Sequence, residues 1–202
     1  MSDDRITRLP GVAPHETPHL GRELERRHLD ALLRELDHGE TSHEAGNTSN
    51  DILRYREGDG TGGPPDTDGA WCATVQSYCW IVAAAEMRVR LPFRTSRGAK
   101  ALTERIGVGG RFILPPKVAP PAWEVISTRL LRGCTIATTR AGGGHVMTFD
   151  RLDDDGREAL IILEGNKNNR GPRGARYAVV GPRLVQYVAL RPILHAISTL
   201  QP

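Results

Sequence analysis

The chain has 202 residues, of which 39% are hydrophobic and 25% charged. This length and balance suit one folded domain with an extension and exclude wholesale disorder. The formal charge of +3 is small and scattered, so nucleic acid is not expected as a partner. No apolar run approaches the length that spans a bilayer, and membrane insertion is not expected either.

The beginning of the chain predicts an arm and then a helix. About 18 residues hold three prolines and no periodic pattern, and leucines at near-helical spacing follow from Leu20 to Leu36. We expect this amphipathic helix to end near Gly39 and to pack on the domain or on a partner. We therefore place a boundary after residue 45, giving regions 1–45 and 46–202. Because no apolar run of signal-peptide length follows the acidic N-terminus, we expect synthesis in the cytoplasm and any export by another route.

A turn-rich run, Asp59 to Asp66, is followed by an apolar, alanine-rich stretch that predicts a helix. Thr67 or Asp68 is its expected N-cap, and it should stop shortly before Pro92. These limits place Cys72 in about the first helical turn.

Further helices are predicted at Asp51 to Arg56 and at Ser96 to Ile106, and the proline-rich segment 111–121 is expected to be an irregular crossing. From Gly133 onward the pattern predicts strands instead. The expected strands are residues 134–139, 144–152, 158–164, 176–180 and 184–190, with a hairpin turn at 153–156. Helices followed by a meander predict an α+β fold, with N-terminal helices packed on an antiparallel sheet of about five strands.

Three cysteines cannot all pair, and the absence of C-x-x-C spacing argues against a zinc or disulfide framework. Cys79 lies inside the predicted helix and is expected to be buried filler. Cys72 differs, because the positive end of a helix and its unpaired N–H groups favour a thiolate. His145 opens a predicted strand directly after a glycine run and is the candidate base.

The next predicted strand ends at Glu164, and Asn166 follows closely. In an antiparallel hairpin the start of one strand lies beside the end of the next, so both residues should lie near His145. We favour Glu164 as the group that orients His145, because a carboxylate stabilises an imidazolium more strongly than an amide does. Asn166 remains the alternative. The backbone N–H of Cys72 is one expected oxyanion donor, and Tyr55 is a candidate for the second.

Three short motifs carry a family resemblance: Trp71-Cys72-Ala73, Gly144-His145-Val146 and Glu164-Gly165-Asn166. They resemble the CHAP family of cysteine, histidine-dependent amidohydrolases and peptidases, over roughly residues 47–190. The resemblance implies a papain-like fold in region 46–202, with Cys72 as nucleophile, His145 as base, and Glu164 or Asn166 as third member. A Cys-His pair suffices for acyl transfer, so no metal or organic cofactor is expected. One departure is Gly133-Cys134, where members often carry Gly-Asp.

Family members mostly cut amide bonds in peptidoglycan, so the resemblance implies the peptide part of peptidoglycan as substrate. Expected substrate contacts are Tyr55, Trp71, Lys167 and Arg170, the last two in a basic loop that is alternatively a solvated turn. The expected setting is an antibacterial effector or a phage lysin, delivered by a secretion system or a holin and acting in the periplasm or cell wall. For an effector, an inhibitory immunity protein is a further expected partner.

Two other functions stay open at this stage. One is a catalytically inactive CHAP-like module that binds wall or a partner protein, with the Leu20 to Leu36 helix as its docking surface. The other is a cysteine transamidase or peptidase that acts on protein. The relative reactivity of Cys72 and the other thiols separates the first from an enzyme.

Overall fold

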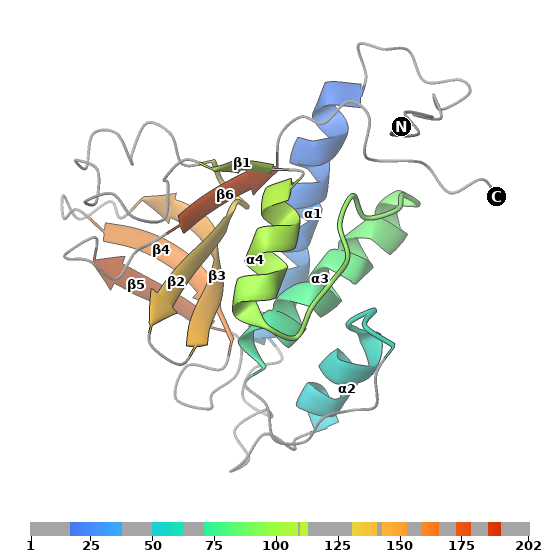
Figure 1. The fold of residues 1–202 in the computed structure, drawn as a ribbon, viewed down its shortest axis with the longest axis horizontal. Coiled ribbons are helices and arrows are strands. Elements are labelled where there is room, and N and C mark those ends of the chain that lie inside the picture. The colour runs from blue at the N-terminus through green and yellow to red at the C-terminus, as the bar shows by residue number, and fades with distance from the viewer. Residues whose placement is uncertain are drawn as a thin grey trace, which may run out of the picture.

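The computed structural model describes residues 17–37, 50–62, 71–108, 110–112, 131–140, 143–152, 159–165, 173–178 and 186–190. The architecture is α+β, as expected: helices lie on one side and an antiparallel sheet on the other (Figure 1). No helix in these ranges is long and apolar enough to cross a membrane.

Four helices in the described part precede the main run of strands. They are α1 (Thr17–Asp37), α2 (Asn50–Gly58), α3 (Cys72–Met87) and α4 (Ala99–Val108). The start of α3 differs from the expectation: its N-cap is Trp71, not Thr67 or Asp68, so Cys72 is the first helical residue. At the other end, Arg88 adopts the left-handed conformation with φ of 53° and closes the helix before Pro92.

The sheet of the described residues has the strand order β1-β6-β2-β3-β4-β5. Its strands are β1 (Gly110–Phe112), β2 (Thr135–Arg140), β3 (Gly143–Leu152), β4 (Ala159–Glu164), β5 (Arg173–Ala178) and β6 (Gln186–Leu190). Strands β2 to β5 form the predicted antiparallel meander, and β6 pairs with the other edge of β2. Strand β1 lies at the start of the segment that was expected to be irregular. A strand forms there because its residues pair with β6. The predicted turn at 153–156 lies outside the described residues.

Helix α3 is the central element, and its side chains are buried around most of its circumference. It can be apolar on all sides because α1, α2 and strand β3 all contact it. Trp80, for example, is 1% exposed and stacks on His28 of α1 with ring centroids 3.8 Å apart. The helix that carries Cys72 is therefore held firmly, and so is its first turn.

Helix α1 packs within the same core and is not a free docking surface. Leu24 shares an apolar cluster with Cys72 and Val146, while Leu29 and Leu32 share another that reaches α3 and β4. Each fully buried leucine contributes about 1.5–3 kcal/mol to stability relative to an exposed one. Of the two roles expected for this helix, packing on the domain or on a partner, the structure shows the first, because its buried leucines lie in the core of the chain.

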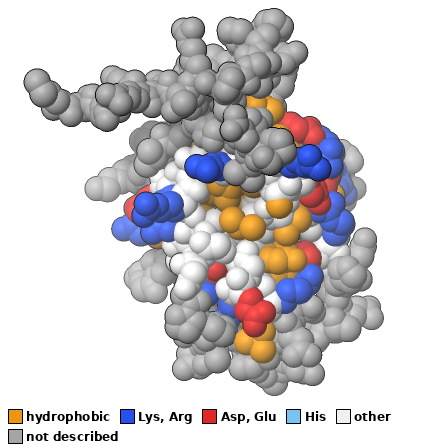
Figure 2. Space-filling view, turned by 90° about the vertical axis from the view of Figure 1, so that its right-hand side faces the viewer, with side chains coloured by type: hydrophobic (Ala, Val, Ile, Leu, Met, Phe, Trp, Pro, Cys, Tyr) orange, Lys and Arg blue, Asp and Glu red, His pale blue; other side chains and the backbone are white. Residues whose placement is uncertain are grey.

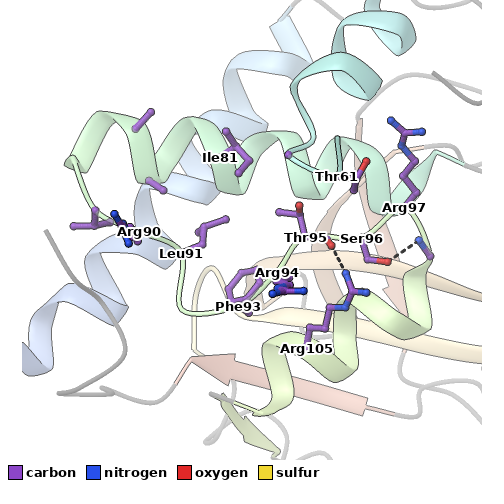
Figure 3. A pocket seen from close by; sticks show the side chains of 15 residues that line it. Thr61, Ile81, Arg90, Leu91, Phe93, Arg94, Thr95, Ser96, Arg97 and Arg105 are labelled. Carbon is purple, nitrogen blue, oxygen red and sulfur yellow. Dashed lines mark hydrogen bonds between the residues drawn. The ribbon is translucent and has the colours of Figure 1, made fainter. Parts of the chain in front are cut away.

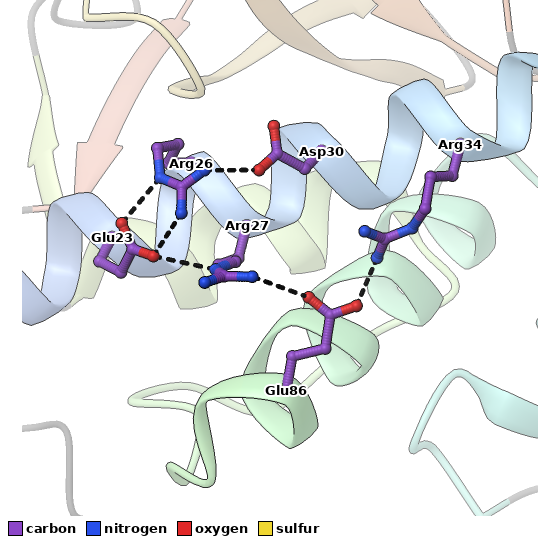
Figure 4. Close-up of polar contacts among 6 residues, drawn as sticks. All are labelled: Glu23, Arg26, Arg27, Asp30, Arg34 and Glu86. Carbon is purple, nitrogen blue, oxygen red and sulfur yellow. Dashed lines mark hydrogen bonds and ion pairs between the residues drawn. The ribbon is translucent and has the colours of Figure 1, made fainter.

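Ion pairs bind the polar face of α1 to α3 (Figure 4). Glu86 near the end of α3 accepts from Arg34 at 2.5 Å and lies 3.8 Å from Arg27, both on α1. Arg27 also contacts Glu23 one turn earlier at 2.9 Å. Such exposed pairs contribute about 0–1 kcal/mol each, so the leucine face determines most of the packing.

Candidate active site

Cys72 stands at the position of a helix that best holds an anion. It is the first residue of α3, and the N-cap Trp71 supplies no side-chain cap. The amides of the first turn have no carbonyl partner within the helix. Two nearby backbone N–H groups, those of Ala73 in this turn and of Val146 in β3, lower the pKa of the Cys72 thiol.

Sheet register brings His145 and Glu164 together. Met147 of β3 pairs with Glu164 of β4, and His145 lies two residues before Met147, on the same face of the strand. The Nε2 atom of His145 donates to Oε2 of Glu164 at 2.9 Å. This leaves Nδ1 free of Glu164, and Cys72 and His145 lie close enough for each to shift the pKa of the other. The structure therefore joins Cys72, His145 and Glu164 in one chain of contacts.

The protonation states of the two central groups are set by each other. Burial opposes ionisation of Cys72, but the hydrogen bond and charge of His145, with the two backbone N–H groups, lower the pKa of the thiol below its ordinary value. Burial also disfavours the charged imidazole, yet Cys72 and Glu164 together raise the pKa of His145 to about 9. These opposed shifts favour transfer of the thiol proton to the imidazole, and therefore a thiolate–imidazolium pair.

For Cys79 and Cys134, burial outweighs the nearby groups that would favour a thiolate. Burial raises the pKa of Cys79 well above its usual range and raises that of Cys134 to about 12. Both side chains are 0% exposed.

We therefore expect iodoacetamide at mildly acidic pH to alkylate Cys72 much faster than Cys79 or Cys134 in the folded protein. The reason is that the thiolate is the reactive form, and the pKa of Cys72 is lowered whereas the pKa values of Cys79 and Cys134 are raised. Peptide mass spectrometry after timed quenching measures the three rates. Equal rates would contradict the thiolate assignment, and denatured protein, in which the three should react alike, is the control.

Glu164 is buried with 0% exposure at the end of β4, where its carboxylate reaches the ring of His145. Asn166, the alternative orienting residue, lies outside the described residues, as do Lys167 and Arg170 of the basic loop. The choice between Glu164 and Asn166 can be made with variants.

We expect Glu164→Gln to lower kcat/KM about ten-fold or more, because a charge-assisted hydrogen bond becomes a neutral one. The same change removes a carboxylate that raises the pKa of His145, so the alkaline limit of activity should move to lower pH. Asn166→Ala is the comparison and should lose less. A collapse confined to Asn166→Ala would make the amide the orienting group.

Tyr55 and Trp71, both expected to contact substrate, are core residues instead. Tyr55 is 1% exposed, and its hydroxyl donates to Oε2 of Glu35 at 2.7 Å. Burial, followed by the contact with Glu35, raises the pKa of Tyr55. Trp71 is 0% exposed, and its ring stacks on that of Tyr55. Both are corrected to packing residues that seat α2 against the start of α3, and Tyr55 is not available as an oxyanion donor.

Gly165 allows the end of β4 to approach α3 closely. A Cβ atom built on Gly165 would lie 2.6 Å from Cγ1 of Val75 and 2.9 Å from Cζ3 of Trp71. This close approach gives a physical reason for glycine directly after Glu164.

Gly165→Ala is expected to destabilise the fold by about 1–3 kcal/mol through overpacking. It should also slow Cys72 alkylation, because displacing Glu164 weakens the hold on His145. Urea unfolding and the alkylation assay measure the two effects. Gly98→Ala is the matched control, since its Cβ would meet nothing nearer than 3.8 Å; equal stability losses in the two variants would refute the overpacking argument.

A buried hydrogen bond between the two elements that carry Cys72 and His145 was not predicted from the sequence. Thr148 of β3 donates from Oγ1 to Oε1 of Gln76 of α3 at 2.8 Å. Gln76 is four residues after Cys72, and Thr148 is three after His145, so this bond ties together the two elements that carry the pair. A glutamine in an alanine-rich helix and a threonine in an apolar strand were the available signals.

Within the described residues, no group of three or more His, Cys, Asp or Glu is arranged to hold a metal ion. Comparisons with protein-family models, curated proteins and solved structures found no match to this chain. The CHAP-type interpretation therefore depends on the motif residues and on the geometry around Cys72.

Proposed function

We propose that this chain is a cysteine amidohydrolase of the CHAP type that cleaves amide bonds in the peptide part of peptidoglycan. The observation that carries the proposal is the chain of contacts from Cys72 through His145 to Glu164, with a lowered thiol pKa and a raised imidazole pKa. Opposed shifts in adjacent titratable groups are typical of a nucleophile and its acid–base partner.

The chemistry proceeds in two steps. The Cys72 thiolate attacks the amide carbonyl, and the His145 imidazolium gives its proton to the leaving amine, which leaves a thioester. His145, now neutral, takes a proton from water as the water attacks the thioester, and the released acid restores the thiolate–imidazolium pair. Glu164 keeps the imidazole oriented and stabilises its charged form. The backbone N–H of Cys72 faces no helical acceptor and is a candidate donor to the oxyanion.

The assembled site favours an enzyme over an inactive binding module. A module without catalysis has no need for a thiol whose pKa is lowered by an imidazole and by two backbone N–H groups. Its proposed docking face on α1 is also buried in the core. A peptidase acting on protein would use the same three residues, so substrate assays must separate it from a wall amidase.

Digestion of purified peptidoglycan is the direct test. Wild-type protein should release fragments with new amino and carboxyl ends in the stem peptides, identified by mass spectrometry, and Cys72→Ala should release none. Cleavage of casein with intact peptidoglycan would contradict the wall substrate and leave a protein-directed peptidase.

We further propose that the protein acts in the cell wall or periplasm after delivery, as an effector or a lysin does. In a bacterial host, periplasm-directed protein should lyse cells, cytoplasmic protein should not, and Cys72→Ala should be harmless in both. Toxicity confined to the cytoplasm would rule out the wall.

A further inference from the structure

A groove lies near the opposite end of α3 from Cys72. This groove of about 870 Å³ is formed by the second half of α3, the segment from Val89 to Gly98 that follows it, Thr61 and Arg105 of α4. Ile81 at its edge is nine residues beyond Cys72, which is roughly 13 Å along the helix axis. The described lining contains neither His145 nor Glu164. The groove is therefore separate from the candidate active site.

The floor of the groove is apolar and its rim is cationic. Ile81, Ala84, Ala85, Val89, Leu91 and Phe93 supply hydrophobic surface. Arg90, Arg94, Arg97 and Arg105 also line it, and no Asp or Glu is among the described lining residues. Figure 2, which views the right-hand side of Figure 1, shows hydrophobic side chains gathered on that face, with Lys and Arg side chains to either side and several Asp and Glu side chains near them.

The arginines differ in how they are held. Arg97 donates to Oδ2 of Asp59 at 2.6 Å, and Arg105 donates to the carbonyl of Thr95, so these two fix the local chain. Within the described residues, Arg90 and Arg94 have no ion-pair partner. Figure 3 shows Arg90 beside Leu91 at one end of the groove, Arg97 at the other, and Arg94 and Arg105 between them. The positive charges follow the length of the groove and do not converge on one point.

We propose that this groove binds an acidic, amphipathic segment of a partner protein. Carboxylates spaced along an extended chain would match the spread of arginines, and intervening apolar side chains would fill the floor. Interfaces are enriched in arginine and aromatic residues and depleted in acidic ones, which is the composition found here. Charge complementarity of this kind selects the partner and accelerates its association.

Other anions fit less well. A single phosphate would need several donors around one position, and the arginines are distributed instead. A membrane surface would not reach a recessed floor. Single-stranded nucleic acid needs open aromatic faces, whereas Phe93, the aromatic residue among the described lining, packs edge to face on Trp80 at 5.4 Å.

The test uses a short fluorescein-labelled peptide in which Glu and Leu alternate, with the full chain as receptor and anisotropy as readout. The wild type should bind it, and the same peptide with Gln in place of Glu should bind at least about ten-fold more weakly. Arg94→Glu should weaken binding about ten-fold or more, and Leu91→Ser should also weaken it because the floor loses apolar contact. Inorganic phosphate at concentrations that leave ionic strength unchanged should not compete.

Lys100→Glu is the matched control, because it makes the same charge change at an α4 residue that is 77% exposed and outside the groove. Its affinity should stay within about two-fold of the wild type. Equal weakening by Arg94→Glu and Lys100→Glu, equal binding of the Gln peptide, no binding by the wild type, or displacement by phosphate would each overturn the proposal. Cys72 alkylation should be unchanged in Arg94→Glu, so this test and that of the amidase are independent.

Discussion

Cys72→Ala is expected to lower amide hydrolysis by at least about 1,000-fold while leaving the fold intact. The sulfur is the nucleophile of the proposed reaction, and it belongs to the one described thiol whose pKa is lowered, whereas burial raises the pKa of Cys79 and Cys134. Alanine is the residue most favourable to a helix, so α3 should keep its start. Release of stem-peptide fragments from peptidoglycan measures the activity, and circular dichroism with urea unfolding measures the fold.

Cys79→Ala is the matched control, because it makes the same change in the same helix at a thiol whose pKa is raised by burial. Catalysis should survive it, and any loss should be in the free energy of unfolding, where removing a buried sulfur leaves a small cavity. Turnover that persists in Cys72→Ala, or that disappears in Cys79→Ala with the fold intact, would remove Cys72 as nucleophile.

The order and type of the elements follow from patterns that the sequence displays. Leucines at helical spacing predict α1, and alternating apolar runs from Gly133 onward predict β2 to β6 within a few residues. Strand β1 was not predicted, since its three residues carry too little pattern and it exists through pairing with β6. The same limit applies to the N-cap at Trp71, because a capping residue is chosen by tertiary packing as well as by propensity.

The candidate site was predictable where it depends on sheet topology. The neighbouring ends of β3 and β4 follow from a hairpin, and so does the contact of His145 with Glu164. Tyr55 was misplaced for a different reason: its hydroxyl donates to Glu35 of α1, a residue 20 positions away in the preceding helix. Contacts between helices that are far apart in the sequence leave no local sequence pattern. The arginine-lined groove could not be predicted from the sequence for the same reason.

His145→Ala is expected to be nearly as severe as Cys72→Ala, with a loss of about 100- to 10,000-fold in hydrolysis, since the leaving amine loses its proton donor. The thiol should change as well. His145 is the largest factor that lowers the pKa of Cys72, and without it burial is opposed only by the N–H groups of Val146 and Ala73. Removing the positive partner raises the pKa of Cys72, so its alkylation profile should move to higher pH. Timed iodoacetamide labelling across the pH range measures this shift.

The direction of this change in the pKa of Cys72, and the pH range in which it affects alkylation, make the test specific. In the wild type the thiolate–imidazolium pair exists from the lowered pKa of Cys72 up to about pH 9, where His145 loses its proton. The variant should therefore react more slowly than the wild type in the lower part of this window and approach it at higher pH. His28→Phe is the control: burial lowers the pKa of His28 to about 3, so this ring is neutral, and a phenyl ring keeps the stacking on Trp80. An unchanged profile in His145→Ala would mean that the first turn of α3 alone ionises Cys72, and that His145 is not its partner.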